Sequence, residues 1–427
     1  MLQVFKFGGA SVKDATGVKN LTEILKSEHN SSNTRENKLV VVVSAMGKTT
    51  NLLEKLLVRF FNEKSLENPY LEEAKAFHFG IASELFPDPT HPIFDEISNL
   101  FVEIEWVLED GPVDSFDFTY DQIVSMGELL STTVVSHYLN SQGLTNTWVD
   151  ARNFIATDNQ YREANVDWEK TEKLIQAGFP PLLEKGLIVT QGFIGSTSEN
   201  FTTTLGREGS DYSAAIFAAC LDAKQVCIWK DVPGVLNADP KWFDHTELIP
   251  ELSYLDAIEL TYYGATVIHP KTIKPLQNKG INLFVRSFLD SSGQGTRIGK
   301  EASHLPVSSF IFKVDQVLIS IMPKDFSFIV EDNLSHIFHL FHTHRVKINM
   351  MHNSAVSFSV SVDNQPEYLN NLVHALEKAF QVNVQDKLEL ITIRYYDQDT
   401  MERVLKEKEI IMELRDRNTC QLLVKNL

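Results

Sequence analysis

The sequence predicts an α/β fold in which helices cover both faces of a mainly parallel sheet, followed by a smaller α+β region. Strand and helix patterns alternate over the first part, and residues 38–43, KLVVVV, form an apolar run typical of a strand buried on both faces. Residues 293–299 are rich in glycine, and the order of elements changes after them. We therefore expect domains at 1–300 and 301–427.

The elements of the first part follow from periodicity and turn residues. The helical but irregular stretch 65–120, which contains FPDPTHP, is interpreted as an insertion or lid. Gly143 is the expected stop of the helix before it. The expected strands are 3–7, 37–47, 186–195, 225–235 and 281–288 as the last, and the expected helices are 14–28, 49–63, 121–143, 210–223 and two within 252–280.

The second part reads strand-helix-strand-strand-helix-strand from residue 316 to about 394, the pattern of a small ferredoxin-like ligand-binding unit. A further short helix near 400–409 and a strand near the end indicate a second, truncated unit, because no closing helix follows.

Composition narrows the class of protein. A formal net charge of −18 argues against non-specific binding of nucleic acid or of an anionic membrane. The three scattered cysteines form no disulfide framework and fit a reducing compartment. With no leader pattern and no apolar run of membrane-spanning length, we expect a cytoplasmic protein.

Two glycine-containing turns follow the first two strands. Lys6 ends the first strand and Gly8 and Gly9 form its turn, which suits close approach of a phosphate beside a mobile cation. The second strand leads to Ser44 and Thr50. The GKT of this segment lacks the first glycine of a P-loop, since Val42 stands there. Both turns are expected at the carboxyl edge of the sheet, where ligands bind.

Glu128 lies among apolar residues of the expected helix 121–143 and needs a partner. A structural arginine is the favoured partner when this residue is taken alone, and a positively charged ligand group is the alternative.

The segment TTTLGREGSDYSAA, residues 202–215, gathers short polar groups ahead of a helix. Ser210 or Asp211 is expected as the N-cap, Arg207 suits a carboxylate, and Asp211 is suited to orienting a lysine or holding a metal ion. A ligand that carries both carboxylate and phosphate explains more of this segment than capping does.

The loop after 225–230 carries four charges around a Val-Pro-Gly turn, which are solvated or bind a nucleotide. They are Lys230, Asp231, Asp239 and Lys241.

Taken together, KFGGASV, VVSAMGKTTN, MGELLST, VTQGFIG, TTTLGREGSD, DVPGVLNADP and YYGATVIHP resemble the aspartate kinases of the amino-acid kinase superfamily, in the same order, and the tail resembles their tandem ACT regulatory domains. The resemblance implies phosphorylation of the side-chain carboxylate of L-aspartate by ATP with Mg²⁺, giving 4-phospho-L-aspartate for lysine, threonine and methionine biosynthesis. It also implies a homodimer or higher homo-oligomer with a possible amino-acid effector, and no length remains for a fused dehydrogenase.

The resemblance also implies roles for the matching residues. Lys6, Gly8, Gly9 and Asp211 act on the transferring phosphoryl group, with Mg²⁺ held mainly by ATP and possibly by Asp211. Aspartate is bound by Ser44, Thr50, Glu128 (ammonium), Arg207 (α-carboxylate) and Ser210. The ATP site contains Lys6, Gly8, Gly9, Ser11, Lys230, Asp231, Asp239 and Lys241.

Four positions depart from the family pattern. Glu208 replaces a common glycine, Leu236 a tyrosine and Thr266 a lysine near the nucleotide phosphates. Lys230 stands where threonine is common, and our hypothesis is that its charge substitutes for the lysine lost at 266. Two other readings stay open: a sister kinase acting on glutamate, because Glu128 and Arg207 suit any α-amino acid, and a non-catalytic amino-acid sensor.

Lysine-sensitive relatives place an aspartate and a glutamate where this chain has Asn349 and Ala355. A charge-assisted hydrogen bond contributes ~1.5–3 kcal/mol, so losing two weakens lysine binding by about a hundredfold or more. We therefore expect weak or absent inhibition by lysine, measured as initial rates over a lysine titration. Inhibition at submillimolar lysine would contradict this expectation.

Overall fold

The structure, a computed structural model, describes residues 1–30, 38–63, 68–112, 114–243, 245–265, 268–302, 307–325 and 327–427. It contains two compact units, each with its own sheet. Unit 1 comprises Met1–Val235, Pro250–Ile258 and Ile268–Ser303, and unit 2 comprises Leu236–Ile249, Glu259–Val267 and His304–Leu427. The assignment of a catalytic role to 1–300 and a regulatory role to 301–427 stays a prediction.

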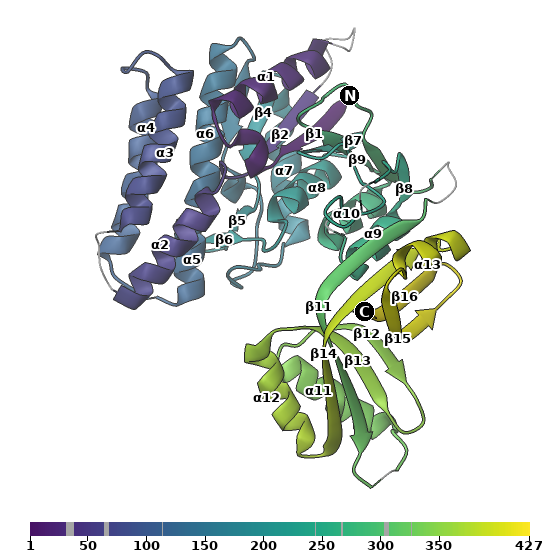
Figure 1. The fold of residues 1–427 in the computed structure, drawn as a ribbon. Coiled ribbons are helices and arrows are strands. Elements are labelled where there is room, and N and C mark those ends of the chain that lie inside the picture. The colour runs from purple at the N-terminus through teal and green to yellow at the C-terminus, as the bar shows by residue number, and fades with distance from the viewer. Residues whose placement is uncertain are drawn as a thin grey trace. The chain divides into compact units, whose positions relative to one another are not determined.

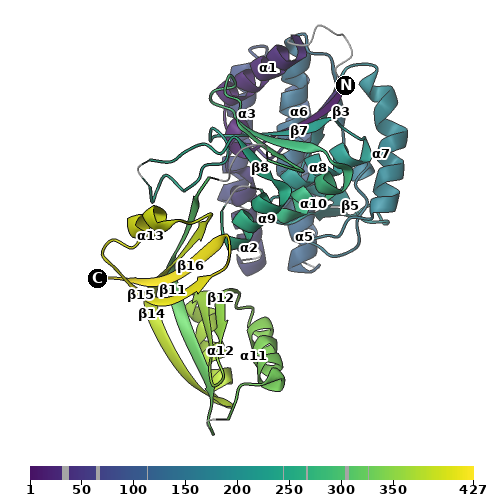
Figure 2. The same ribbon diagram turned by 90° about the vertical axis from the view of Figure 1, so that its right-hand side faces the viewer.

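Unit 1 is built on an eight-stranded sheet of order β3-β4-β2-β1-β7-β9-β10-β8 (Figures 1 and 2). The run from β3 to β9 is parallel, β10 is antiparallel to β9, and β8 is parallel to β10. The expected α/β sheet is confirmed. The strands are β1 (Leu2–Phe7), β2 (Lys38–Val43), β3 (Asn146–Val149), β4 (Leu187–Gln191), β7 (Gln225–Lys230), β8 (Glu251–Ser253), β9 (Asn282–Ser287) and β10 (Thr296–Gly299).

Helices cover both faces of this sheet (Figures 1 and 2). Helix α8 contacts β1, β2 and β7 and packs between α7 and α10, whereas α6 contacts β2 and β4 and packs against α1 to α5 (Figure 1). The helices are α1 (Ala15–Asn30), α2 (Thr49–Glu63), α3 (Pro69–Leu85), α4 (Ile93–Glu109), α5 (Phe116–Val124), α6 (Met126–Ser141), α7 (Trp168–Leu183), α8 (Gly209–Cys220), α9 (Tyr254–Tyr263) and α10 (Pro270–Lys279), with short 3₁₀ turns η1 (Gly9–Val12) and η2 (Ala151–Asn153).

Three expectations about element boundaries were wrong. The single helix 121–143 divides at Ser125, whose hydroxyl donates to the Gln122 carbonyl at 3.2 Å and so competes with the helical hydrogen bonds. The strand 186–195 divides at Phe193, which has a left-handed φ of 72° and turns the chain out of the main sheet. The strand 281–288 is not the last of its sheet, because β10 follows it.

After this turn, β5 (Ile194–Ser196) pairs with β6 (Thr202–Thr204) in a separate two-stranded sheet. Strand β6 leads directly into the loop that carries Arg207. The division at Phe193 therefore directs the chain toward the start of α8.

Unit 2 contains a six-stranded antiparallel sheet of order β12-β13-β11-β14-β16-β15. The long strands β11 and β14 lie at its centre and pair along most of their length. The predicted strand-helix-strand-strand-helix-strand order is confirmed. The elements are β11 (Ser309–Pro323), α11 (Glu331–Thr343), β12 (Ile348–Asn353), β13 (Phe358–Asp363), α12 (Pro366–Glu377), β14 (Phe380–Arg394), α13 (Gln398–Val404), β15 (Lys408–Arg415) and β16 (Thr419–Asn426).

Two hydrophobic cores of unit 2 lie beneath its helices, and a third includes Met350, Leu388, Leu390 and Leu423. One lies beneath α11 and α12 and includes Ile319, Phe341 and Leu372. The other lies beneath α13, where Phe243 stacks on Phe310 with ring centroids 4.7 Å apart. Phe243 comes from the segment Leu236–Ile249. This segment therefore adds to a core that is otherwise covered by one short helix, α13.

The polar groups of Asn349 are used within unit 2. Its side-chain oxygen accepts a hydrogen bond from the Lys313 ammonium at 2.7 Å, and its amide donates to Asp363 at 2.8 Å and to Gln316 at 3.0 Å. A free lysine ligand would compete with Lys313 for the same oxygen. The weak lysine binding expected from the sequence stays a prediction.

Candidate active site

The centre of the site is a buried carboxylate between two lysines. Asp211, in the first turn of α8, is fully buried. One of its oxygens lies 2.7 Å from the Lys6 ammonium, and the other lies 3.6 Å from the Lys230 ammonium. Burial acts to raise the pKa of Asp211, but the charges of the two lysines outweigh it and hold the pKa below its ordinary value. The predicted juxtaposition of Lys6 and Asp211 is therefore present as a charged group of three.

Parallel pairing brings the two lysines together. Lys6 is the penultimate residue of β1, and Lys230 is the last residue of its neighbour β7. Because both strands run in the same direction, both side chains reach the carboxyl edge of the sheet, where α8 begins.

The turn after β1 is tied to the turn after β2. The Gly47 amide donates to the Gly9 carbonyl at 3.0 Å, and the Ser44 amide donates to the Phe7 carbonyl at 3.1 Å. A Cβ atom on Gly9 would lie 2.6 Å from the Ala45 carbonyl oxygen, which excludes any larger residue without movement of the backbone. A Cβ on Gly8 would make only ordinary contact, 3.5 Å from the Lys6 ammonium nitrogen.

Glu128 lies in the first turn of α6 and is 3% exposed. One carboxylate oxygen accepts a hydrogen bond from the Ala45 amide at 3.2 Å. The other oxygen has no hydrogen-bond partner within the described part of the chain. Burial raises the pKa of Glu128 to about 8, although the Ala45 amide and the charge of Lys6 partly oppose this.

The favoured interpretation of Glu128 as the partner of a structural arginine was wrong. No arginine pairs with it within the described ranges, and its second oxygen is buried and unpartnered. An unpartnered buried acceptor is costly, and the alternative interpretation, a positively charged ligand group as the partner, stays a prediction.

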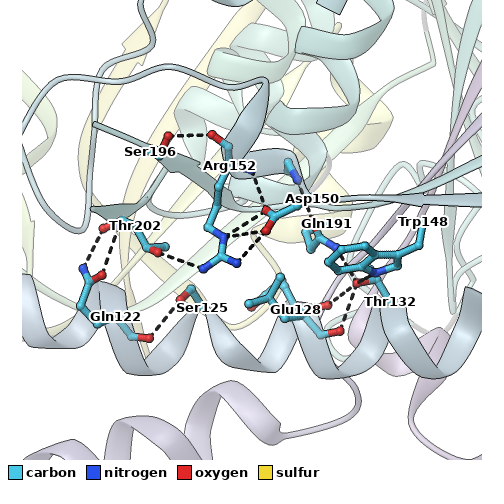
Figure 3. A network of polar contacts seen from close by, with 12 residues as sticks. Gln122, Ser125, Glu128, Thr132, Trp148, Asp150, Arg152, Gln191, Ser196 and Thr202 are labelled. Atoms are coloured by element: carbon cyan, nitrogen blue, oxygen red, sulfur yellow. Dashed lines mark hydrogen bonds and ion pairs between the residues drawn. The ribbon is translucent and has the colours of Figure 1, made fainter. Parts of the chain in front are cut away.

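A network of side chains fixes the part of α6 that carries Glu128 (Figure 3). The Thr132 hydroxyl donates to the Glu128 carbonyl at 2.8 Å and accepts from Gln191 at 2.7 Å and from Trp148 at 3.0 Å. Gly127 allows close packing, because a Cβ there would lie 3.0 Å from the Ala45 side chain. The sequence analysis missed Gln191 and Thr132; the only available signal was that Gln191 is a polar residue ending a buried strand.

The start of α8 differs from the expected capping. The N-cap position is Glu208, which is exposed, has a left-handed φ of 56° and makes no capping hydrogen bond through its side chain. Ser210 and Asp211 lie inside the first turn instead, so their assignment as N-cap was wrong. Asp211 is thereby free to face the lysines rather than the helix amides.

Arg207 is exposed, and no ion pair or hydrogen bond engages its guanidinium among the described residues. Ser210 is 9% exposed and packs beneath Gly192, where a Cβ would lie 2.5 Å from that of Ser210. The loop therefore presents one uncommitted cation next to a tightly packed turn.

The remaining predicted residues are distributed as follows. Ser11 is buried in η1, whereas Ser44 and Thr50 are half-buried and Asp231 is exposed. Asp239, Lys241 and Leu236 belong to unit 2, so their part in a nucleotide site stays a prediction. Thr266 lies outside the described residues.

Comparison with known proteins places the chain in a family. The amino acid kinase family matches residues 1–287. The lysine-sensitive aspartokinase 3 of Escherichia coli is 30% identical over 403 residues, which cover 91% of this chain and 86% of that protein. The chain belongs to the amino acid kinase family, among the aspartokinases.

Other aspartokinases match over different lengths. A bifunctional aspartokinase/homoserine dehydrogenase 2 of Arabidopsis thaliana is 34% identical over 308 residues, but the match covers only 32% of that longer protein. The crystal structure of E. coli aspartokinase III in complex with aspartate and ADP superimposes with a TM-score of 0.81 at 28% identity, covering 100% of this chain and 96% of that one.

This aspartokinase has, in the described residues, no helix long and apolar enough to cross a lipid bilayer. Nor do they hold a group of three or more His, Cys, Asp or Glu side chains placed to bind a metal ion.

The raised pKa of Glu128 predicts a specific pH dependence of stability. The unfolded chain releases this proton near the ordinary value of 4.5, whereas the folded protein keeps it until about 8. The free energy of unfolding therefore falls as the pH rises between these values and levels off above. Glu128→Gln removes this component, so the melting temperature of the variant should gain on wild type as the pH rises from about 5 to about 8.

Glu84→Gln is the matched control, because Glu84 is exposed in α3. Its melting temperature should follow wild type at every pH. A constant difference between Glu128→Gln and wild type over this range would show that Glu128 ionises normally in the folded protein.

Proposed function

We propose that the chain catalyses the transfer of the γ-phosphoryl group of ATP to the side-chain carboxylate of L-aspartate. The observation that supports this best is the buried carboxylate of Glu128, one of whose oxygens has no hydrogen-bond partner among the described residues. Its other oxygen accepts from the Ala45 amide, and the Ala45 carbonyl packs on the proposed phosphate-binding turn at Gly9. An amino acid can place its ammonium group against Glu128 and direct its side-chain carboxylate to Lys6 beside this turn. The product, 4-phospho-L-aspartate, would serve lysine, threonine and methionine biosynthesis.

The amino-acid substrate is held by its α-substituents in this proposal. Its ammonium group donates a hydrogen bond to the unpartnered oxygen of Glu128. Its α-carboxylate binds the exposed guanidinium of Arg207. Ser44, Thr50 and Ser210 line the remainder of the site. The side-chain carboxylate then points toward the Lys6 ammonium.

The chemical step needs no strong general base, because the attacking carboxylate is already ionised. One of its oxygens forms a bond to the γ-phosphorus while the bond from this phosphorus to the bridging oxygen of ADP breaks. Lys6 neutralises charge on the transferring phosphoryl group, and the Gly8–Gly9 turn lets this group approach the backbone. Asp211 keeps the ammonium groups of Lys6 and Lys230 in place. Catalysis is alignment and charge neutralisation.

Mg²⁺ is assigned to the nucleotide in this proposal. The carboxylate of Asp211 already faces two ammonium groups, and the described residues offer no cluster of metal ligands around it. The ion would therefore be held mainly by the phosphates of ATP and would supply charge neutralisation there. Ser11, Lys230, Asp231, Asp239 and Lys241 are the residues proposed for the ATP side.

The proposal is tested by turnover with Mg-ATP and L-aspartate, with hydroxylamine present to trap the acyl phosphate as a hydroxamate. L-Glutamate is assayed in parallel. Hydroxamate from aspartate alone supports the proposal, and hydroxamate from glutamate alone redirects it to a sister kinase. No hydroxamate from either, with folded protein, would overturn it and favour a sensor.

Lys6→Ala should lower kcat by about a hundredfold or more, as loss of one donor to a developing charge does elsewhere. The variant also removes the closer cation from Asp211, so its folding is checked by circular dichroism. Lys19→Ala, an exposed lysine of α1, is the control and should keep wild-type kcat. Near-normal turnover of folded Lys6→Ala would refute the role assigned to Lys6.

A further inference from the structure

We propose that Asp121 and Gln122, in α5, are positioning residues that set the separation between Glu128 and Arg207. In the proposed function, Glu128 receives the ammonium group and Arg207 the α-carboxylate of the amino acid, so the inference rests on that function. We call the contacts of Asp121 and Gln122 with β6 the α5–β6 clamp. Neither residue touches the reacting groups.

Asp121 is fully buried and accepts three hydrogen bonds from distant parts of the chain. One oxygen accepts from the Thr204 hydroxyl at 2.7 Å. The other accepts from the Thr204 amide at 2.9 Å and from the Arg162 amide at 2.9 Å. Because all three donors must point at this buried carboxylate, Asp121 fixes the backbone positions of Thr204 and Arg162.

Gln122 completes the clamp one residue along the helix (Figure 3). Its side-chain amide donates to the Thr202 carbonyl at 2.9 Å and accepts from the Thr202 amide at 3.2 Å. It therefore occupies the edge of β6 that a further strand would occupy, while β5 pairs with the other edge. The backbone of β6 is held from both sides.

Thr202 has a third contact. The Arg152 guanidinium, which forms an ion pair with Asp150 at 2.6 Å, also lies 3.4 Å from the Thr202 hydroxyl (Figure 3). Arg152 approaches from η2, whereas Gln122 approaches from α5. The position of β6 is thus fixed by side chains from two separate elements.

The clamp connects the two ends of the proposed amino-acid site. Asp121 lies seven residues before Glu128, across the junction of α5 and α6 at Ser125, and Thr204 lies three residues before Arg207. A short path of bonded groups therefore joins Glu128 to Arg207 through α5 and β6. Without it, the loop of Arg207 would no longer be tied to the helix pair that carries Glu128, and the two receptors would lose their fixed spacing.

The predicted effect is a selective loss of amino-acid affinity. Asp121→Asn keeps the shape of the side chain but replaces a charged acceptor by a neutral amide, whose single oxygen cannot accept from the Thr204 hydroxyl and from the two backbone amides at once. We expect the KM for aspartate to rise about tenfold, with the KM for ATP and kcat within about twofold of wild type. A merely structural role would lower the melting temperature and the active fraction, which reduces apparent kcat while the KM for aspartate stays unchanged.

Asp117→Asn is the matched control. Asp117 is an exposed aspartate of the same helix, and it pairs with the side chain of Arg162 at 3.3 Å. It should leave both KM values unchanged. Gln122→Ala provides a second test that keeps Asp121, in case Asp121→Asn fails to fold, and should raise the KM for aspartate by about threefold.

Hydrogen exchange tests the clamp without any reference to activity. The amides of Thr202, Thr204 and Arg162 should exchange about tenfold faster in Asp121→Asn or Gln122→Ala, each at the contacts it removes, and at the wild-type rate in Asp117→Asn. Unchanged exchange would overturn the clamp itself. Faster exchange with an unchanged KM for aspartate would overturn its positioning role. Failure of wild type to phosphorylate aspartate is a separate result: it refutes the proposed function, while exchange still decides the clamp.

Discussion

The buried charge of Asp211 is the constraint on which the rest of unit 1 depends. A carboxylate that is fully removed from water is stable only if opposite charges replace its hydration, and Lys6 and Lys230 supply them. Each lysine stands at the carboxyl end of a strand, and the two strands are neighbours. The order of the sheet, the direction of α8 and the tight glycine turn at Gly9 all serve this arrangement. The same charges form the centre to which a phosphoryl group is proposed to move.

Much of this could be predicted from the sequence. The β-branched run of β2 and the glycine turn after Lys6 carry local signals, so the sheet and its carboxyl edge were predicted correctly. The breaks at Ser125 and Phe193 were missed, because apolar periodicity runs through both positions and the deciding contacts are local backbone choices. The partner of Glu128 and the role of Asp121 were also beyond reach, since both depend on residues about 80 positions away in the chain.

Unit 2 shows how the core beneath α13 is completed. The sequence indicated a second unit with one short helix, and α13 is that helix. The core beneath α11 and α12 and the core beneath α13 share β11 and β14, and the core beneath α13 takes Phe243 and Ala238 from the segment Leu236–Ile249. This segment was interpreted from its charges alone, as part of a nucleotide loop. Its aromatic residue has a packing function that the charge pattern gave no reason to expect.

The place of β1 between β2 and β7 affects the order in which the protein can fold. The first strand lies between the second and the seventh, so one edge of β1 stays unpaired until about 225 further residues have been synthesised. Lys6 is made at the start of the chain, whereas its partners Asp211 and Lys230 are made only near the time of β7. An N-terminal fragment that ends before β7 would have β1 as an exposed edge strand, a template for self-association. Unit 1 is therefore completed late in synthesis, rather than grown strand by strand from its N-terminus.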